Sequence, residues 1–131
     1  MKKEPKLEII ALSDYADFSK EGKVNIAGIF DEVYAEKLPA SIVRCFVVFT
    51  VTGFAPKSTI KVRMVIEGSS GVLIEKELDG DIGKNGKGNF RLQILGLAVN
   101  EYGAHTISIF HDKELLGKTL YHVIKAENGV T

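Results

Sequence analysis

The sequence predicts an all-β protein with a single domain, folded as an antiparallel β-sandwich of about eight strands. Apolar residues alternate with polar ones in several segments, and this period of two is typical of half-buried strands. Turn residues separate the segments at short intervals, as they do in sandwiches and barrels. No window of helical length carries an apolar stripe with helical spacing. A two-sheet Greek-key sandwich is therefore favoured, with an eight-stranded barrel as the alternative.

The predicted strands each end at turn-forming residues. The first follows the apolar run from Leu7 to Leu12, and the second is so long that Gly28 is expected to mark a bulge or bend in it. The third is almost continuously apolar, which indicates a central strand covered on both faces. A short turn over residues 13–20, capped by Ser13, is the best helical candidate. The predicted strands are residues 7–13, 23–36, 42–53, 58–67, 72–79, 88–97, 103–111 and 115–125.

The fourth and fifth strands form a hairpin whose register follows from side-chain parity. Two apolar pairs face the core in this register, and two pairs of opposite charge lie on the solvent face. Such cross-strand pairs stabilise a sheet, so the basic residues are explained without a nucleic-acid ligand. The expected pairs are Ile66 with Ile74, Val62 with Leu78, Arg63 with Glu77, and Lys61 with Asp79.

The last three strands supply much of the predicted core. His105 lies on the apolar face of its strand, so we expect it to be buried and hydrogen-bonded to a backbone carbonyl. His122 lies between Tyr121 and Val123 and is expected to face solvent. The residues predicted to face the core are Ile60, Val62, Met64, Ile66, Ile74, Phe90, Leu92, Ile94, Ile107, Ile109 and Val123.

Length and charge narrow the function classes. The chain has 131 residues, enough for one domain, with 17 basic and 17 acidic residues and a net charge of zero. This balance gives no reason to expect nucleic acid or a membrane surface as a partner. The single cysteine and the lack of a long apolar segment favour a cytoplasmic protein. The ends, at about residues 1–5 and 127–131, are expected to be loose tails.

No catalytic constellation is evident, so we expect neither an enzyme nor a cofactor. Cys45 lies within an apolar strand, where an inert buried thiol is typical. His105 and His111 are six residues apart on one strand, or roughly 20 Å, so they cannot bind the same metal ion. Nucleophilic catalysis needs a nucleophile, a base and an orienting group in reach of each other.

The glycine-rich segment from Asp79 to Asn89 is the most unusual in composition. It lacks the spacing of a phosphate-binding loop, and no helix follows it. Asp79, Asp81 and Asn85 partly match a calcium loop, but the later ligand positions are not filled by oxygen donors. We interpret the segment as a connection between strands, with Asn85 beginning its tight turn.

A second acidic set gives the alternative function. Asp14, Asp17, Asp31 and Glu32 lie on two early segments that we expect to meet at one end of a sandwich. Calcium-dependent sandwich domains gather carboxylates in this way. A calcium site at Asp14, Asp17 and Asp31 is therefore the alternative to plain solvated carboxylates.

The segment from Leu92 to Ile107 resembles the stretch that enters strand F of immunoglobulin-like sandwiches. Glu101 and Gly103 match the acidic and small residues of that pattern, while His105 stands where the corner tyrosine would be. The resemblance implies an immunoglobulin-like sandwich. The chain has no tryptophan and no second cysteine, so an antibody-type domain is excluded.

Most of the chain is similar to a family of short bacterial proteins of unknown function. The similarity covers residues 12–16, Gly22 to Asp31, Pro39, the apolar strand 43–51 and Gly103 to Asp112. It supports the fold and implies no activity.

The function favoured by the sequence is a non-enzymatic binding or assembly module. Calcium binding is the alternative, and an enzyme whose site the sequence does not reveal comes third. Its partner is expected to be another protein or a second copy of the chain. The second strand carries apolar residues on both faces, among them Ile29, Val33 and Tyr34. Such an excess suggests contact on two sides, and hence a possible homodimer.

Overall fold

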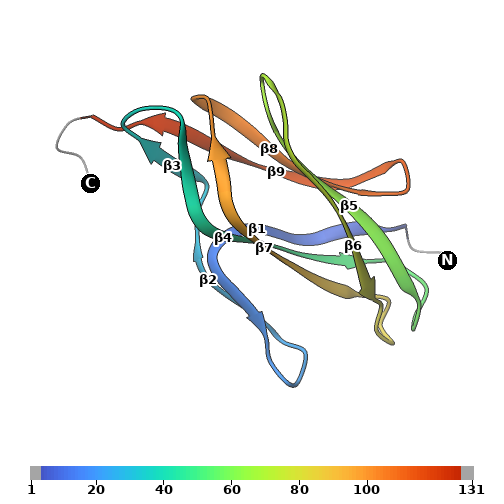
Figure 1. Ribbon diagram of the computed structural model, residues 1–131. Coiled ribbons are helices and arrows are strands. Elements are labelled where there is room, and N and C mark those ends of the chain that lie inside the picture. Colours follow the sequence, from blue (N-terminus) through green and yellow to red (C-terminus); the bar gives the residue numbers. More distant parts are fainter. Residues whose placement is uncertain (1–3, 128–131) are drawn as a thin grey trace.

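The computed structural model describes residues 4–127, which form nine strands in two packed sheets (Figure 1). Of the predicted tails at about residues 1–5 and 127–131, residues 1–3 and 128–131 lie outside the described residues. No helix in this range is long and apolar enough to cross a membrane. The strands are β1 (Lys6–Phe18), β2 (Val24–Ile29), β3 (Glu32–Ala35), β4 (Ala40–Thr52), β5 (Thr59–Gly68), β6 (Gly71–Asp81), β7 (Gly88–Val99), β8 (Gly103–His111) and β9 (Glu114–Lys125).

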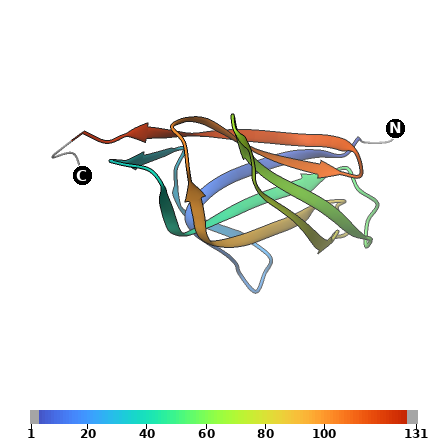
Figure 2. The ribbon, with the colours of Figure 1, turned by 45° about the horizontal axis from the view of Figure 1, so that its top comes forward.

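The two layers confirm the predicted sandwich over the barrel. One sheet has the order β2-β1-β4-β7 and the other the order β3-β9-β8-β5-β6 (Figure 2). The pairs are antiparallel except for β3, which runs parallel to β9. In the second sheet β8 lies between β5 and β9, which is the arrangement of strands C, F and G in an immunoglobulin sandwich. Residues 103–107 resemble the start of strand F, and they begin β8, which has the position of strand F in this sheet. The predicted immunoglobulin-like sandwich is therefore confirmed.

The prediction of one strand over residues 23–36 is wrong, because the chain changes sheets there. Gly28 has a φ of +72°, and the strand ends at the next residue. The Phe30 amide donates to the Leu12 carbonyl (2.9 Å) in the first sheet, and the His122 amide donates to the Asp31 carbonyl (2.8 Å) in the second. Two short strands on opposite layers replace the single long one.

The helical candidate over residues 13–20 is also wrong, since β1 continues to Phe18. Ser13 is fully buried, and its hydroxyl donates to the Tyr15 carbonyl (3.2 Å) within the strand instead of capping a helix. Ala16 packs with Phe46 in a second apolar cluster, apart from the main core. Tertiary packing therefore decides the conformation of a segment whose polar residues locally favour a turn.

The core between the sheets contains the residues that alternation assigned to it. Nine of the eleven predicted core residues are buried, and Ile74 and Leu92 are partly buried against them. The β5–β6 hairpin has the four predicted pairs in register. Arg63 forms its ion pair diagonally, with Glu75 (3.0 Å), and not with the residue directly opposite. Phe49 and Phe90 stack at 4.8 Å between ring centroids.

Candidate binding site

One lateral side of the sandwich has two strand edges without a covering strand. β2 pairs with β1 only from Ser13 to Phe18, and β3 pairs with β9 only from His122 to Lys125. Within residues 4–127, Lys6–Leu12 of β1 and Glu114–Tyr121 of β9 therefore have no strand partner on that side. We call this side, bounded by these two segments, the open flank.

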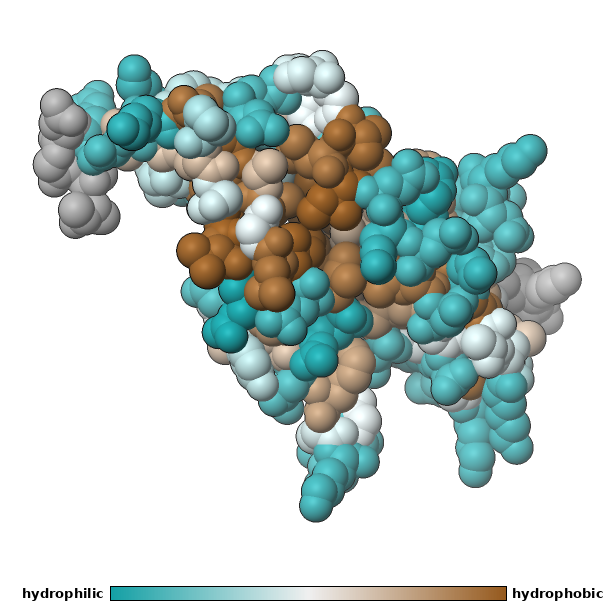
Figure 3. Space-filling view, viewed as in Figure 1, coloured by the Kyte–Doolittle hydropathy of each residue, from teal (hydrophilic) through white to brown (hydrophobic). Residues whose placement is uncertain are grey.

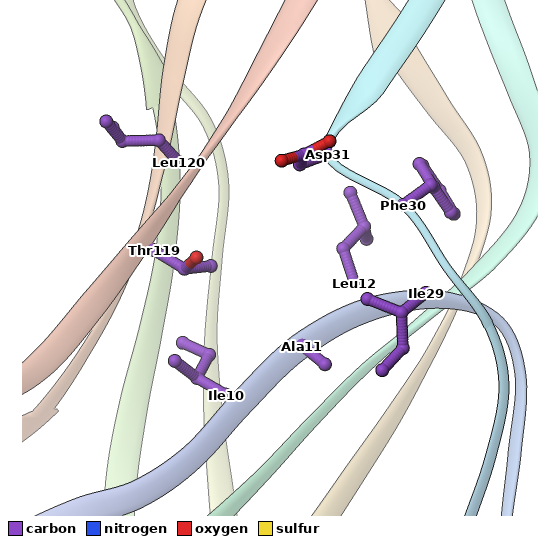
Figure 4. Close-up of a pocket in the computed structure, with 8 residues that line it drawn as sticks. All are labelled: Ile10, Ala11, Leu12, Ile29, Phe30, Asp31, Thr119 and Leu120. Carbon is purple, nitrogen blue, oxygen red and sulfur yellow. The ribbon is translucent and has the colours of Figure 1, made fainter.

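A hollow of about 340 Å³ lies in the open flank between the two sheets (Figure 4). The crossing residues Phe30 and Asp31 bound one end. At the other end the strands meet, because a Cβ placed on Gly117 would lie 2.7 Å from the Leu7 side chain. The rim exposes apolar surface: Ile29 is 67% and Leu120 49% exposed. The hollow is lined by Ile10, Ala11, Leu12, Ile29, Phe30, Asp31, Thr119 and Leu120.

Backbone groups point into the open flank from both edges. The Leu12 carbonyl and the His122 amide face this side, because they bond to the crossing residues Phe30 and Asp31. The backbone direction repeats every second residue along a strand. Ile10 and Leu120, which are two residues away on regular stretches of β1 and β9, therefore direct their N–H and C=O groups to the same side. The flank can accept hydrogen bonds from, and donate them to, an added strand.

Among the residues that the structure describes, Asp31 is the one ionisable residue in the lining of the hollow. Its side chain is exposed, and Figure 4 shows the carboxylate pointing toward β9. In the described part of the chain, the two ion pairs Arg63–Glu75 and Lys87–Glu8 and the contact between His111 and Asp112 do not include Asp31. The hollow thus combines an apolar lining with one negative charge that has no ionic partner within residues 4–127.

The structure does not gather the predicted calcium ligands. Asp17 accepts hydrogen bonds from the Tyr15 hydroxyl (3.1 Å) and the Asn25 amide (3.0 Å). Asp14 packs against Gly28, and Asp31 lines the hollow. Among the residues described, no three His, Cys, Asp or Glu side chains form a group that could hold a metal ion.

The glycine-rich segment connects two strands, as predicted, from the end of β6 to the start of β7, and these strands belong to different sheets. Asp81 accepts a hydrogen bond from the Thr59 hydroxyl (3.0 Å), and the Asn85 side chain accepts one from the Lys87 amide (3.1 Å). Ile82 is buried, which anchors the segment to the core. Asp81 and Asn85, two of the three oxygen donors considered for calcium, are thus engaged in hydrogen bonds at this connection.

The predicted burial of His105 and Cys45 and the predicted exposure of His122 are confirmed. His105 is only 1% exposed, its Nδ1 lies 3.0 Å from the Gly103 carbonyl oxygen, and its ring stacks on Tyr121. His122 faces solvent. Burial leaves Cys45 no exposed surface and raises the pKa of its thiol to about 11. None of these groups lines the hollow.

Sequence reasoning missed the role of Glu101. The hydroxyl and amide groups of Ser70, together with the Ser69 hydroxyl, donate hydrogen bonds to its carboxylate and lower its pKa to about 2. The carboxylate closes the turn between β5 and β6, beside the buried His105. Its match to an immunoglobulin pattern was the only sequence signal. Because it is ionised and held by the turn, Glu101 is a structural acceptor.

The apolar excess on residues 23–36 is mostly used within the molecule. Phe30 and Val33 pack against the main core, and Ile26 packs against the second cluster. Ile29 and Tyr34 remain exposed. Val33 therefore supports folding, whereas Ile29 belongs to the rim of the hollow.

A second group of apolar side chains is exposed where β4 begins and β7 ends, on the side seen in Figure 3. Val43 is 82% and Leu95 71% exposed. Leu95 lies opposite Arg44 in the register, and Val43 is the residue before Arg44 on β4. Neither of them lines the hollow in the open flank.

Solved structures show that this fold recurs in larger proteins. The chain is similar to part of the alkylpurine DNA glycosylase AlkC of Pseudomonas fluorescens, bound to DNA with an abasic site analogue, at 14% identity and a TM-score of 0.55. It is also similar to part of a β-glucosidase of Listeria innocua in complex with glucose, at 8% identity and a TM-score of 0.50. The matches cover 92% of this chain but only 30% and 16% of those proteins, respectively.

A third structure, an immunoglobulin-like protein of Pseudomonas aeruginosa, matches over 94% of this chain and 98% of its own length. Its identity is 15% and its TM-score 0.49. At these identities the first two likenesses show a shared fold and carry no activity across. A search of curated protein sequences finds no match.

Sequence comparison is more specific about relatedness. A model described as a family of unknown function (DUF6941) matches residues 8–124, which is most of the chain. The matched range includes every strand from β2 to β8 and most of β1 and β9. The predicted resemblance to a family of unknown function is therefore confirmed, and the chain belongs to the DUF6941 family.

Proposed function

We propose that this protein is a non-enzymatic binding module that takes up a protein partner at the open flank. The observation that carries the proposal is the hollow between β1 and β9, where apolar side chains and free backbone groups meet at one surface. Protein interfaces depend on a few apolar or aromatic anchors buried in pockets. A hollow of about 340 Å³ is large enough to receive one such anchor.

A binding role agrees with the chemistry of the lining. Catalysis by side chains needs at least two cooperating groups at one place, such as a nucleophile and its base. Within the described residues, Asp31 is the one ionisable side chain at the hollow, and His105 and Cys45 lie in the core instead. We also propose a cytoplasmic location, supported by the single free cysteine.

Site-specific cross-linking in the native host tests the proposal. We would replace Leu120, at the rim of the hollow, by the photoreactive p-benzoylphenylalanine, and make the same change at Val43 as the control. The expected result is a protein adduct at position 120 that is absent at position 43. Excess unmodified protein should compete the adduct away, whereas a Leu120→Lys protein should not.

The outcomes separate the possible partners. An adduct of this chain with itself would assign the flank to a homodimer, and one with another protein would assign it to a heterologous partner. Equal adducts at positions 120 and 43, or none at position 120, would contradict a binding role for the open flank.

A further inference from the structure

We infer that the open flank binds an extended segment of its partner as an added β-strand, with an apolar side chain in the hollow and a basic side chain beside Asp31. This inference rests on the proposed function and names the chemistry of the partner. It requires free backbone groups, a place for a side chain and a complementary charge, and each can be identified in the flank.

The chain itself shows that the flank accepts extended backbone. The crossing segment bonds to both sheets, through Phe30 to Leu12 and through Asp31 to His122. β3 then continues as a parallel strand on β9. A partner segment on the free edges would continue this pairing, using the N–H and C=O groups of Ile10 or Leu120.

The hollow provides the place for a side chain. Side chains of a strand alternate between its two faces, so a segment along the edge directs every second residue toward the space between the sheets. The wall formed by β1 is apolar, with Ile10 and Leu12, and Thr119 faces the same space from β9. The Leu120 side chain alternates to the outer face of β9, beside the free edge (Figure 4). Burying a Leu or Phe side chain there removes apolar surface from water on both partners.

Charge favours a heterologous segment over a second copy of this chain. Asp31 is exposed at the hollow without an ion pair in the described part of the chain. The lining of a second copy would bring another Asp31, and the basic residues of its free edges, Lys6 and Lys118, lie outside that lining. A lysine or arginine in the partner complements the carboxylate, and arginine can bond to both of its oxygens.

Synthetic peptides test the inference with the full chain. The probe is a blocked eight-residue peptide with leucine or valine at alternate positions, threonine between them and one arginine near an end, made in two versions with the arginine at either end. One control peptide has N-methyl groups on alternate residues, which removes backbone donors without changing side chains. A second control has glutamate in place of the arginine. Fluorescence anisotropy measures affinity, and backbone NMR locates the contact.

We expect at least one arginine version to bind and to shift the amide signals of Ile10 and Leu120. At least one of the two registers of N-methylation should abolish binding. Asp31→Asn should lower the affinity for the arginine peptide about fivefold, as loss of a part-exposed ion pair implies. The affinity for the glutamate peptide should not fall. Leu120→Lys should weaken both peptides, and Val43→Lys, the control at the separate apolar surface, should change neither.

Three results would overturn strand addition. N-methylated peptides of both registers that bind as well as the parent would make the hollow a site for apolar side chains alone. Failure of every peptide, together with a cross-linked adduct at position 120, would refute strand addition and leave the binding module standing. A doubled molecular mass at micromolar concentration that Leu120→Lys abolishes, with no peptide bound, would assign the flank to a second copy.

Discussion

The two flanks of the sandwich differ in how far their edge strands are protected from pairing with another chain. The flank between β6 and β7 is drawn together where Gly80 lies directly against the Phe90 ring. Its outer strand β6 carries Glu75, Lys76 and Glu77 in succession, and Lys76 lies opposite Met64 on the core-facing side of the sheet. Charges on an edge strand, especially one that points inward, discourage pairing with another chain.

The open flank has fewer of these protections beside the hollow. Its charged residues Lys6, Glu8, Glu114 and Lys118 lie away from the hollow, whereas Ile9–Leu12 of β1 and residues 119–121 of β9 carry no charge. A hollow separates the two sheets here, whereas Phe90 fills the space beside Gly80 on the other flank. The difference indicates that one flank is built to stay closed and that the other remains available for contact.

The closed flank should be the more costly one to disturb. Phe90 is 3% exposed and stacks on Phe49, so Phe90→Ala removes a buried ring from the core. We expect a loss of about 3–5 kcal/mol in the free energy of unfolding, because the transfer energy and a cavity both contribute. Urea denaturation measures this loss. A loss below about 1 kcal/mol would show that Phe90 does not hold this flank together.

The hairpin that includes β6 should lose stability in acid. Hydrogen bonds from Ser70 hold the pKa of Glu101 at about 2, against an ordinary value of 4.5. A lowered pKa in the folded state stabilises the protein fully above pH 4.5, and this contribution disappears as the pH falls toward 2. Glu101→Gln should therefore reduce stability at pH 7 and flatten the decline between pH 4.5 and 2. Thermal melting of both proteins over this pH range is the measurement. Parallel curves of melting temperature against pH would show that the Ser70 hydrogen bonds to Glu101 do not stabilise the folded protein.

The smallest effect on stability is expected at the open flank. Leu120 is 49% exposed, so shortening its side chain in Leu120→Ala removes little buried apolar surface from the free protein. Its free energy of unfolding should change by no more than about 0.5 kcal/mol. Partner binding should weaken clearly, because Leu120 lies on the free edge of β9 and its side chain would contact the neighbouring side chain of an added strand. A large loss of stability instead would mean that Leu120 serves the core and not the interface.

Local patterns in the sequence are sufficient for most of the strands and the core. The period of two in residues 60–66 and 90–94 marks the faces of β5 and β7, and parity fixes the β5–β6 register because a slip of one residue would reverse every side chain. His105 could be placed in the core by the same reasoning.

Long-range contacts explain what the sequence did not reveal. The break between β2 and β3 depends on Leu12 and His122, which lie far from residues 30 and 31 in the chain but next to them in space. The open flank exists because β2 and β3 end where they do, and no local pattern records that. The sequence places Asp31 only among candidate calcium ligands, because its position at the hollow depends on how the two sheets pack.

Amide hydrogen exchange at Ile10 and Leu120 tests the central claim most directly. Both amides point into the open flank, whereas the neighbouring amides of Ala11 and Tyr121 point to β4 and β8 within the sheets. In the free protein we expect the first two to exchange rapidly and the second two slowly. Adding the arginine peptide that binds, or the cross-linked partner, should slow exchange at Ile10 or Leu120 to the rate of its neighbours. Amides at both positions that are already protected in the free protein, or that exchange equally fast when the partner is bound, would contradict the account.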